Sequence, residues 1–136
     1  MSIELGLLSD ADLSEANLRG AFIHNSGLAR IKLHQATLWR ATLTEVNLEG
    51  ADLSEANLSG AVLTEVYLQQ ANLSSADLVE AILTGGDWTG ANFSNADLWK
   101  AQLSYIDLSQ AIFEEACFES VTFGEEVLLP ENLIIE

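Results

Sequence analysis

The chain has 136 residues, 49% of them hydrophobic, and carries 21 acidic against 5 basic side chains for a net charge of −16. This length supports a single domain, and a lone cysteine, Cys117, excludes an internal disulfide framework. A charge this negative disfavours direct binding of nucleic acid, which needs a basic surface.

The chain begins without the basic start and apolar run of a signal peptide. No apolar stretch approaches the roughly 18 residues that a membrane helix needs. The simplest interpretation is a cytoplasmic protein that does not enter a membrane. Leu5, Leu7 and Leu8 are expected to begin the first turn of a repeat and to close its end.

A five-residue unit repeats without insertion from Ala11 to Glu125, for example at 51–55 (ADLSE). Its central position runs from Leu13 to Phe123 and holds 17 Leu, four Phe, one Ile and one Trp in 23 units. The position two residues earlier is Ala in 16 of the 23 units, and neither position ever holds a charged residue. This segregation indicates that both positions face an interior.

A period of five fits neither an amphipathic helix nor a regular strand. The central residue and the one two before it share a side only if that segment is extended, so the remaining residues must turn a corner. A glycine stands two residues after the centre at Gly20, Gly50, Gly60 and Gly90, where a turn tolerates a positive φ. The pattern predicts short extended sides joined by tight corners.

A slower period gives the number of sides. Segment 41–46 (ATLTEV) returns as 61–66 (AVLTEV), and most exceptions to Ala at the small position fall in one row spaced by twenty residues: Ser26, Val46, Val66, Gly86 and Ile106. Twenty residues are four units, so each coil has four sides and the chain forms about six coils. Gly86 precedes Trp88 by two, and we interpret the smallest residue as making room for the largest.

With Ala-Asp/Asn-Leu at positions such as 11–13, 51–53 and 96–98, the chain resembles the pentapeptide-repeat proteins of the A(D/N)LXX kind over about 115 residues. The resemblance implies an all-β fold, a right-handed quadrilateral parallel β-helix, and a family abundant in cyanobacteria. It also implies an unknown biochemical role, because most members have no known activity. A subset with many central Phe residues mimics DNA and binds topoisomerases.

The predicted organisation is one domain over 1–136, with repeats at about 6–125 and a C-terminal cap at 126–136. The cap is apolar, and Pro130 opposes a continuous helix there. Two interpretations remain open. The cap is a lid over the last layer of Phe in a monomer, or it is a lid shared by two protomers in an end-to-end homodimer.

Outward positions on one wall form a weakly polar ladder: Phe22, Thr42, Val62, Ile82, Gln102 and Thr122. Such a ladder either stabilises parallel strands in the ordinary way or docks a partner or a second copy, because contiguous exposed apolar area usually has a use. The candidate interaction surface consists of these large side chains and others at corners and in the cap: Phe22, Val62, Ile82, Tyr105, Trp39, Trp99, Leu128 and Leu129.

Two polar groups are interpreted as structural, with a binding role as the alternative. Arg30, Lys32, His34 and Arg40 offset nearby carboxylates or bind an anion. The Asp and Asn residues at 52, 72 and 92 share side-chain hydrogen bonds between coils or hold a cation weakly.

No catalytic, cofactor or metal site is predicted. His24 and His34 lie in separate units with no Ser or Cys expected around them, and glutamates such as Glu115 and Glu119 disfavour a thiolate at Cys117. We therefore predict a non-catalytic scaffold that binds an unknown protein partner. The alternative is a DNA-mimicking regulator of a topoisomerase or gyrase.

Overall fold

The computed structural model describes residues 2–3 and 6–135, so the role expected for Leu5 lies outside the described residues. These residues form short parallel strands and no helix. The strands are β1 (Ser2–Ile3), β2 (Phe22–His24), β3 (Thr42–Thr44), β4 (Val62–Thr64), β5 (Ile82–Thr84), β6 (Gln102–Ser104), β7 (Ile106–Asp107), β8 (Thr122–Phe123) and β9 (Val127–Leu128).

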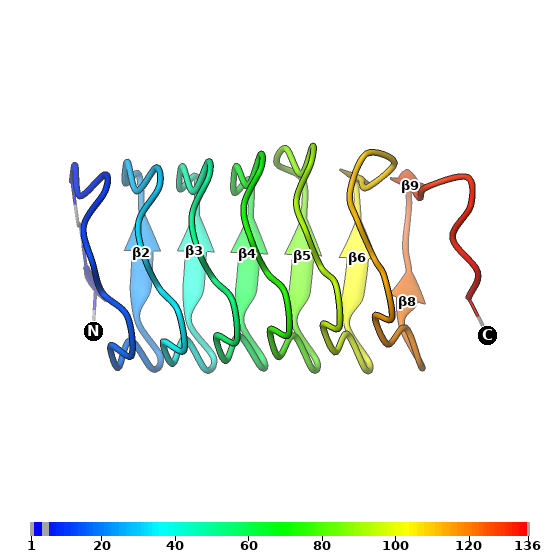
Figure 1. Cartoon of the computed structure of the whole chain (residues 1–136), viewed down its shortest axis with the longest axis horizontal. Coiled ribbons are helices and arrows are strands. Elements are labelled where there is room, and N and C mark those ends of the chain that lie inside the picture. Colours follow the sequence, from blue (N-terminus) through cyan, green and yellow to red (C-terminus); the bar gives the residue numbers. More distant parts are fainter. Residues whose placement is uncertain (1, 4–5, 136) are drawn as a thin grey trace.

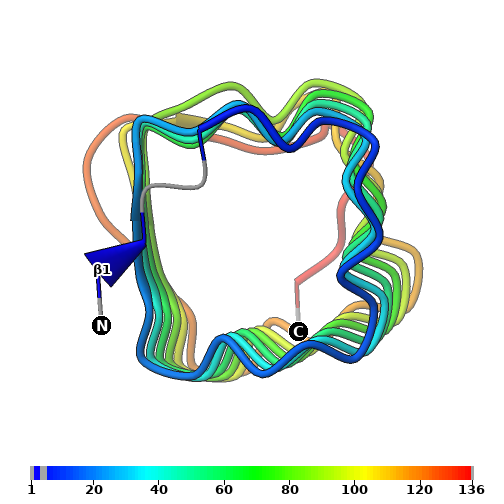
Figure 2. The same ribbon diagram turned by 90° about the vertical axis from the view of Figure 1, so that its left-hand side faces the viewer.

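The chain winds into a four-sided rod whose ends lie at opposite ends of its long axis (Figure 1). Figure 2 looks along the rod from the N-terminal end, and the chain runs clockwise as it recedes, so the coil is right-handed. Both results confirm the predicted fold. We name the walls by their central residues: wall A follows Ile23, Leu43 and Leu63, wall B Leu28 and Leu48, wall C Leu33 and Leu53, and wall D Leu38 and Leu58.

The central and small positions point into the rod, as the alternation requires. In β3, β4 and β5 the middle residue is buried while its two neighbours are half-buried. Each fully buried Leu stabilises the fold by roughly 1.5–3 kcal/mol relative to exposure. The core is therefore a continuous column of side chains that leaves the flanking residues to form the surface.

Hydrogen bonds join each coil to the next in parallel register. The N–H of Leu33 donates to the carbonyl of Asp52 at 2.7 Å, and the N–H of Asp52 donates back to Ile31 at 3.0 Å. On wall A the strands pair in the order β1-β2-β3-β4-β5-β6-β8, with partners twenty residues apart. This spacing confirms that one coil is four units.

The corners are tight turns whose second residue has a positive φ. Gly20 and Gly60 have φ of 66° and 68°, as their position predicts. Most corners use a non-glycine residue instead, for example Glu55 at 56° and Ser75 at 57°. Because a side chain in this region costs roughly 1–2 kcal/mol, the stacking of coils must hold these residues in place.

The structure assigns a different reason for Gly86 than the one predicted. A Cβ there would overlap the carbonyl oxygen of Val66, and the φ of Gly86 is 84°. The limiting neighbour is thus the backbone of the previous coil and not the indole of Trp88. Trp88 is buried, and its Nε1–H donates to the carbonyl of Gly85 at 2.8 Å.

Asp52, Asn72 and Asn92 do not share side-chain hydrogen bonds with one another between coils, so that interpretation is wrong. Each accepts instead from the backbone N–H two residues later in its own unit, at 3.0 Å for Asp52 and Asn72 and 2.9 Å for Asn92. These side chains favour the turn that follows. This local bond explains why the unit prefers Asp or Asn at this position.

The frame slips by one residue in the last coil. β9 pairs with β7 through Ile106↔Val127 and Asp107↔Leu128, a spacing of 21 residues in place of 20. Val127 and Leu129 are consequently half-buried against the core, while Leu128 is 57% exposed. The predicted cap thus divides into a last side of the coil, 127–129, and a tail, 130–135.

The core changes from aliphatic to aromatic towards the C-terminal end. The ring centroids of Trp88 and Phe93 are 5.8 Å apart, those of Phe93 and Phe113 4.8 Å, and those of Phe113 and Phe118 5.0 Å. Leu133 of the tail packs against the core, but Phe123 remains 39% exposed. The last aromatic layer is only partly covered.

Candidate interaction surfaces

The ladder on wall A is a flat row of side chains in register. Phe22, Thr42, Val62, Ile82, Gln102 and Thr122 follow one another through the paired strands. Phe22 is 54% exposed, whereas Val62 and Ile82 are half-buried. The structure therefore brings these three candidates together on one face, with the largest apolar side chain at its N-terminal end.

Tyr105 lies at the corner that follows wall A. Its hydroxyl donates to the Glu125 carboxylate at 2.6 Å, and this bond raises the pKa of Tyr105. The ring is 52% exposed. Tyr105 is thus separate from the ladder and is tied to the last coil.

The two half-buried tryptophans occupy the corner between walls D and A, three coils apart. The Cζ atoms of Arg19 and Arg40 lie 4.3 and 4.6 Å from the ring centroid of Trp39. Lys100 Nζ lies 4.4 Å from the ring centroid of Trp99. Sequence reasoning did not select Arg19, although its position twenty residues before Trp39 was a usable signal.

The expected basic patch does not form as a unit. Arg30 donates to both carboxylate oxygens of Asp10, at 2.8 and 3.0 Å. This side-chain hydrogen bond from Arg30 lowers the pKa of Asp10. Arg40 lies at a different corner, against Trp39. The patch therefore separates into one exposed ion pair and one cation–aromatic cluster.

A serine does stand beside a histidine, contrary to the sequence-based expectation. His34 Nδ1 lies 2.8 Å from the hydroxyl oxygen of Ser54, one coil away. The Ser54 hydroxyl itself donates to the Asp52 carboxylate, so its oxygen is left to accept a hydrogen bond from His34 Nδ1–H. In a nucleophilic triad the serine donates to the histidine and the carboxylate orients the histidine. The observed order is reversed and does not activate the hydroxyl.

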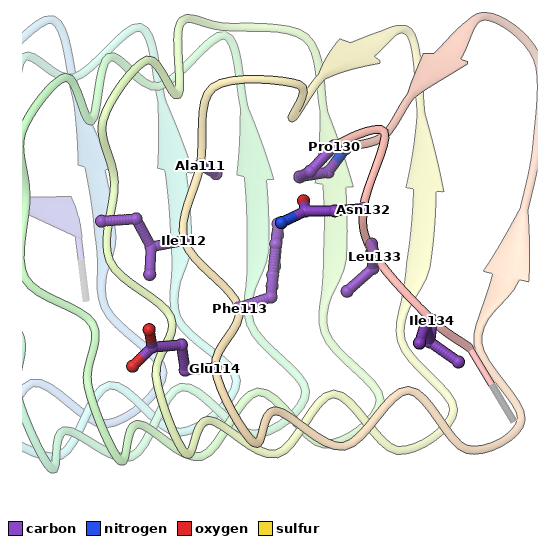
Figure 3. Close-up of a pocket in the computed structure, with 8 residues that line it drawn as sticks. All are labelled: Ala111, Ile112, Phe113, Glu114, Pro130, Asn132, Leu133 and Ile134. Atoms are coloured by element: carbon purple, nitrogen blue, oxygen red, sulfur yellow. The ribbon is translucent and has the colours of Figure 1, made fainter.

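A groove separates the last coil from the tail (Figure 3). It measures about 380 Å³, with the outward Ile112 on one side and Leu133 and Ile134 on the other. Ile112 is 46% exposed and Ile134 81% exposed. A second groove of about 410 Å³ lies beside Cys117 and Ile135. The tail thus crosses the end of the rod without sealing it.

The strand edges at this end are also open. Earlier in the rod the N–H of Phe93 donates to the carbonyl of Ile112 at 2.7 Å, and that of Leu98 donates to Cys117 at 2.9 Å. The backbone N–H groups of Phe113 and Phe118 have no backbone carbonyl partner among residues 2–3 and 6–135. Open edges beside exposed apolar side chains favour pairing with another chain.

Within the described part of the chain, no three His, Cys, Asp or Glu side chains come together in a group that could hold a metal ion. The same residues form no helix long and apolar enough to cross a membrane.

The sequence matches the model of the Pentapeptide repeats family in eight copies, over residues 7–30, 28–60, 47–85, 71–110 and 91–124. The fold resembles that of a pentapeptide repeat protein from the Arabidopsis thaliana thylakoid lumen. That likeness has 28% identity and a TM-score of 0.67, and covers 70% of this chain and 66% of that one.

Rfr23, a pentapeptide repeat protein from the cyanobacterium Cyanothece 51142, is 25% identical with a TM-score of 0.64, over 87% of this chain and 90% of that one. QnrB1, a plasmid-mediated fluoroquinolone resistance protein, is 20% identical with a TM-score of 0.43, over 93% of this chain and 84% of that one. No curated protein matches the chain significantly.

Proposed function

Because the chain belongs to the pentapeptide-repeat family, we propose that it is a non-catalytic scaffold that binds a protein partner at the C-terminal end of its rod. The partner that best suits this end is a second copy of the chain. The cytoplasmic location remains a prediction from the sequence.

The observation that supports this proposal is the incomplete closure of the last coil. Exposed apolar side chains, among them Phe123, Leu128 and Ile134, adjoin the unpaired N–H groups of Phe113 and Phe118. Another chain docked here would cover the apolar groups and could pair the open edges. A second copy docked end to end would present an identical end, so it offers both exposed apolar side chains and an open strand edge.

Charge repulsion opposes this association and makes it depend on the salt concentration. Residues 69–136 hold one basic and twelve acidic side chains, for a net charge of −11, whereas residues 1–68 hold four basic and nine acidic, for −5. Two C-terminal ends therefore repel each other, and added salt screens that repulsion. Association through this end should strengthen as the salt concentration rises.

The test is light scattering of the full chain at low and high salt, beside a variant that ends after Leu129. This variant removes the tail but keeps β9 and the last side of the coil. We expect the fraction of dimer to rise with the salt concentration in the full chain. At each salt concentration the variant should contain less dimer than the full chain. A monomer under every condition would contradict the proposed homodimer and make the tail a simple lid. A dimer that the truncation leaves unchanged would move the interface to the wall A ladder.

A second candidate function is mimicry of DNA towards a topoisomerase, which the charge density favours. The described rod is about 31 Å long at about 4.8 Å per coil, so a net charge of −16 amounts to one charge per ~2 Å of axis. Duplex DNA carries one per about 1.7 Å. A gyrase supercoiling assay tests this candidate, with a variant in which Glu114, Glu115 and Glu119 are replaced by Gln. Mimicry predicts that the parent inhibits supercoiling more than the variant, and no effect of the parent would exclude it.

A further inference from the structure

The corner between walls D and A brings two guanidinium groups onto one indole ring in the first two coils. Arg19 and Arg40 place their Cζ atoms 4.3 and 4.6 Å from the ring centroid of Trp39. Both arginines are exposed and Trp39 is half-buried. Two positive charges thus converge at one point of a strongly acidic protein.

The coil holds this cluster in place through its twenty-residue spacing. The N–H of Gly20 donates to the carbonyl of Trp39 at 2.8 Å, which sets Arg19 directly beside the indole of the next coil. A Cβ on Gly60 would lie 3.1 Å from Arg40 Cγ. The glycine therefore leaves space for the stem of Arg40 to lie against the following coil while its guanidinium meets Trp39.

No carboxylate neutralises this pair. Arg30 forms a two-bond ion pair with Asp10, but neither Arg19 nor Arg40 has an ion pair with any acidic side chain of the described residues. Adjacent like charges repel, and the indole ring adds no negative charge. An anion bound beside Arg19 would lower this repulsion.

The groove at this corner lies beside Arg19. It measures about 220 Å³ and is bounded by Arg19, Thr37, Trp39 and Asn57, so Arg40 stands outside it. Asn57 Oδ1 accepts from the N–H of Ser59 at 3.0 Å, which leaves the Asn57 amide nitrogen as a donor. Arginine likewise only donates. The volume lies below the roughly 300–1,000 Å³ of a site for a whole small molecule, so one compact group fits.

We propose that Arg19 and Asn57, in the groove beside Trp39, bind a single oxyanion, either a carboxylate or a phosphate, and that Arg40 adds positive charge from outside the groove. The planar guanidinium fork matches the geometry of both groups. An extended polyanion such as nucleic acid is repelled by the net charge of −16. The ligand therefore carries its charge in one group.

The test is an NMR titration with acetate and with inorganic phosphate at constant ionic strength, following the indole N–H signals. The Trp99 corner is an internal control, because Lys100 lies against its ring but Val79 stands where Arg19 would be. We expect a saturable shift of the Trp39 signal and none of the Trp99 signal. Tighter binding of acetate identifies a carboxylate ligand, and tighter binding of phosphate identifies a phosphate ligand.

Arg19→Gln should weaken binding by about tenfold, since it removes a charge-assisted donor pair. Arg40→Gln removes only a nearby positive charge and should weaken binding less. Lys100→Gln is the matched control and should leave binding unchanged. Thermal melts verify that every variant folds. Equal shifts at Trp39 and Trp99, or the absence of saturation with both anions, would overturn the proposal.

Discussion

The middle coils and the C-terminal end are built from the same unit but finish differently. In residues 41–80 every central and small position is buried, and the coils pair at a spacing of twenty residues. In the last coil the spacing between β7 and β9 is 21. There Phe123 is 39% exposed although it occupies a central position.

The difference shows that the stacking of a following coil, more than the apolar composition, seals each layer of the rod. The end of the chain is richer in large apolar residues than the middle, yet it exposes more of them. Phe123 still pairs with Leu103 at a spacing of twenty, and the slip that follows turns Val127 and Leu129 towards the core. Phe123 is exposed because β8 is the last strand of its sheet among the described residues. Substitutions at buried, strained and exposed positions of the rod test this comparison.

The largest expected effect is an aspartate at a central position. Leu53→Asp should abolish cooperative folding, because Leu53 is 1% exposed and the carboxylate would face only hydrocarbon. Phe123→Asp should leave a folded protein, because the side chain can reach solvent. Thermal unfolding followed by circular dichroism compares the two. Equal behaviour would mean that burial at the centre does not distinguish the middle from the end.

The second prediction separates the two explanations for Gly86. If the Val66 backbone is the obstacle, Gly86→Ala and Gly86→Val should both destabilise the fold, by about 3 kcal/mol or more. Val66→Ala only trims a buried side chain and should cost about 2 kcal/mol. Denaturant melts measure all three. If Gly86→Ala is mild and Gly86→Val severe, the room needed by Trp88 is the cause after all.

The third prediction concerns the corners. Gly60→Ala should cost about 1 kcal/mol, because its φ is 68°. Ser75→Gly should stabilise the protein by about 0.5 kcal/mol, because Ser75 adopts a φ of 57° and glycine relieves strain while adding disorder to the unfolded chain. Urea midpoints of these two variants test the sign. A loss of stability in Ser75→Gly would show that the corner is not strained.

The smallest expected effect is a pH dependence at Asp87. The Thr89 hydroxyl and backbone N–H both donate to its carboxylate, at 2.7 and 3.0 Å, and these bonds lower the pKa of Asp87. The resulting stability is present above the pKa of the unfolded chain and is lost as the pH falls through the lowered pKa. Thr89→Val should raise this pKa towards its ordinary value, as an NMR titration of the carboxyl carbon would show. An unchanged pKa of Asp87 would mean that a group other than the Thr89 hydroxyl causes the shift.

Much of the fold follows from the sequence because it depends on local rules. The inward positions, the corners and the twenty-residue coil all repeat often enough to be read from residue types. The slip before Val127 was only partly predictable: the regular frame would place the charged Glu126 at an inward position, which marks the end of the frame but does not give the new register. The reason for Gly86 was also hidden, because it lies in the backbone of the neighbouring coil.

The surfaces were less predictable than the core. Spacing alone places Arg19 beside Trp39 and His34 beside Ser54, but side-chain torsions decide which groups meet. Arg30 turned to Asp10 and Arg40 to Trp39, although both were expected in one patch. The candidate residues on wall A, by contrast, lie where the repeat places them.

The direction of the hydrogen bonds has a mechanical consequence. They run along the axis of the rod, and the chain enters at one end and leaves at the other (Figure 1). A force that pulls the two ends apart therefore acts first on the hydrogen bonds between a terminal coil and its neighbour, and then on those of the next pair of coils. Each coil released in this way adds about 65 Å of extended chain, so the rod yields in even steps and is a compliant spring rather than a stiff strut under tension.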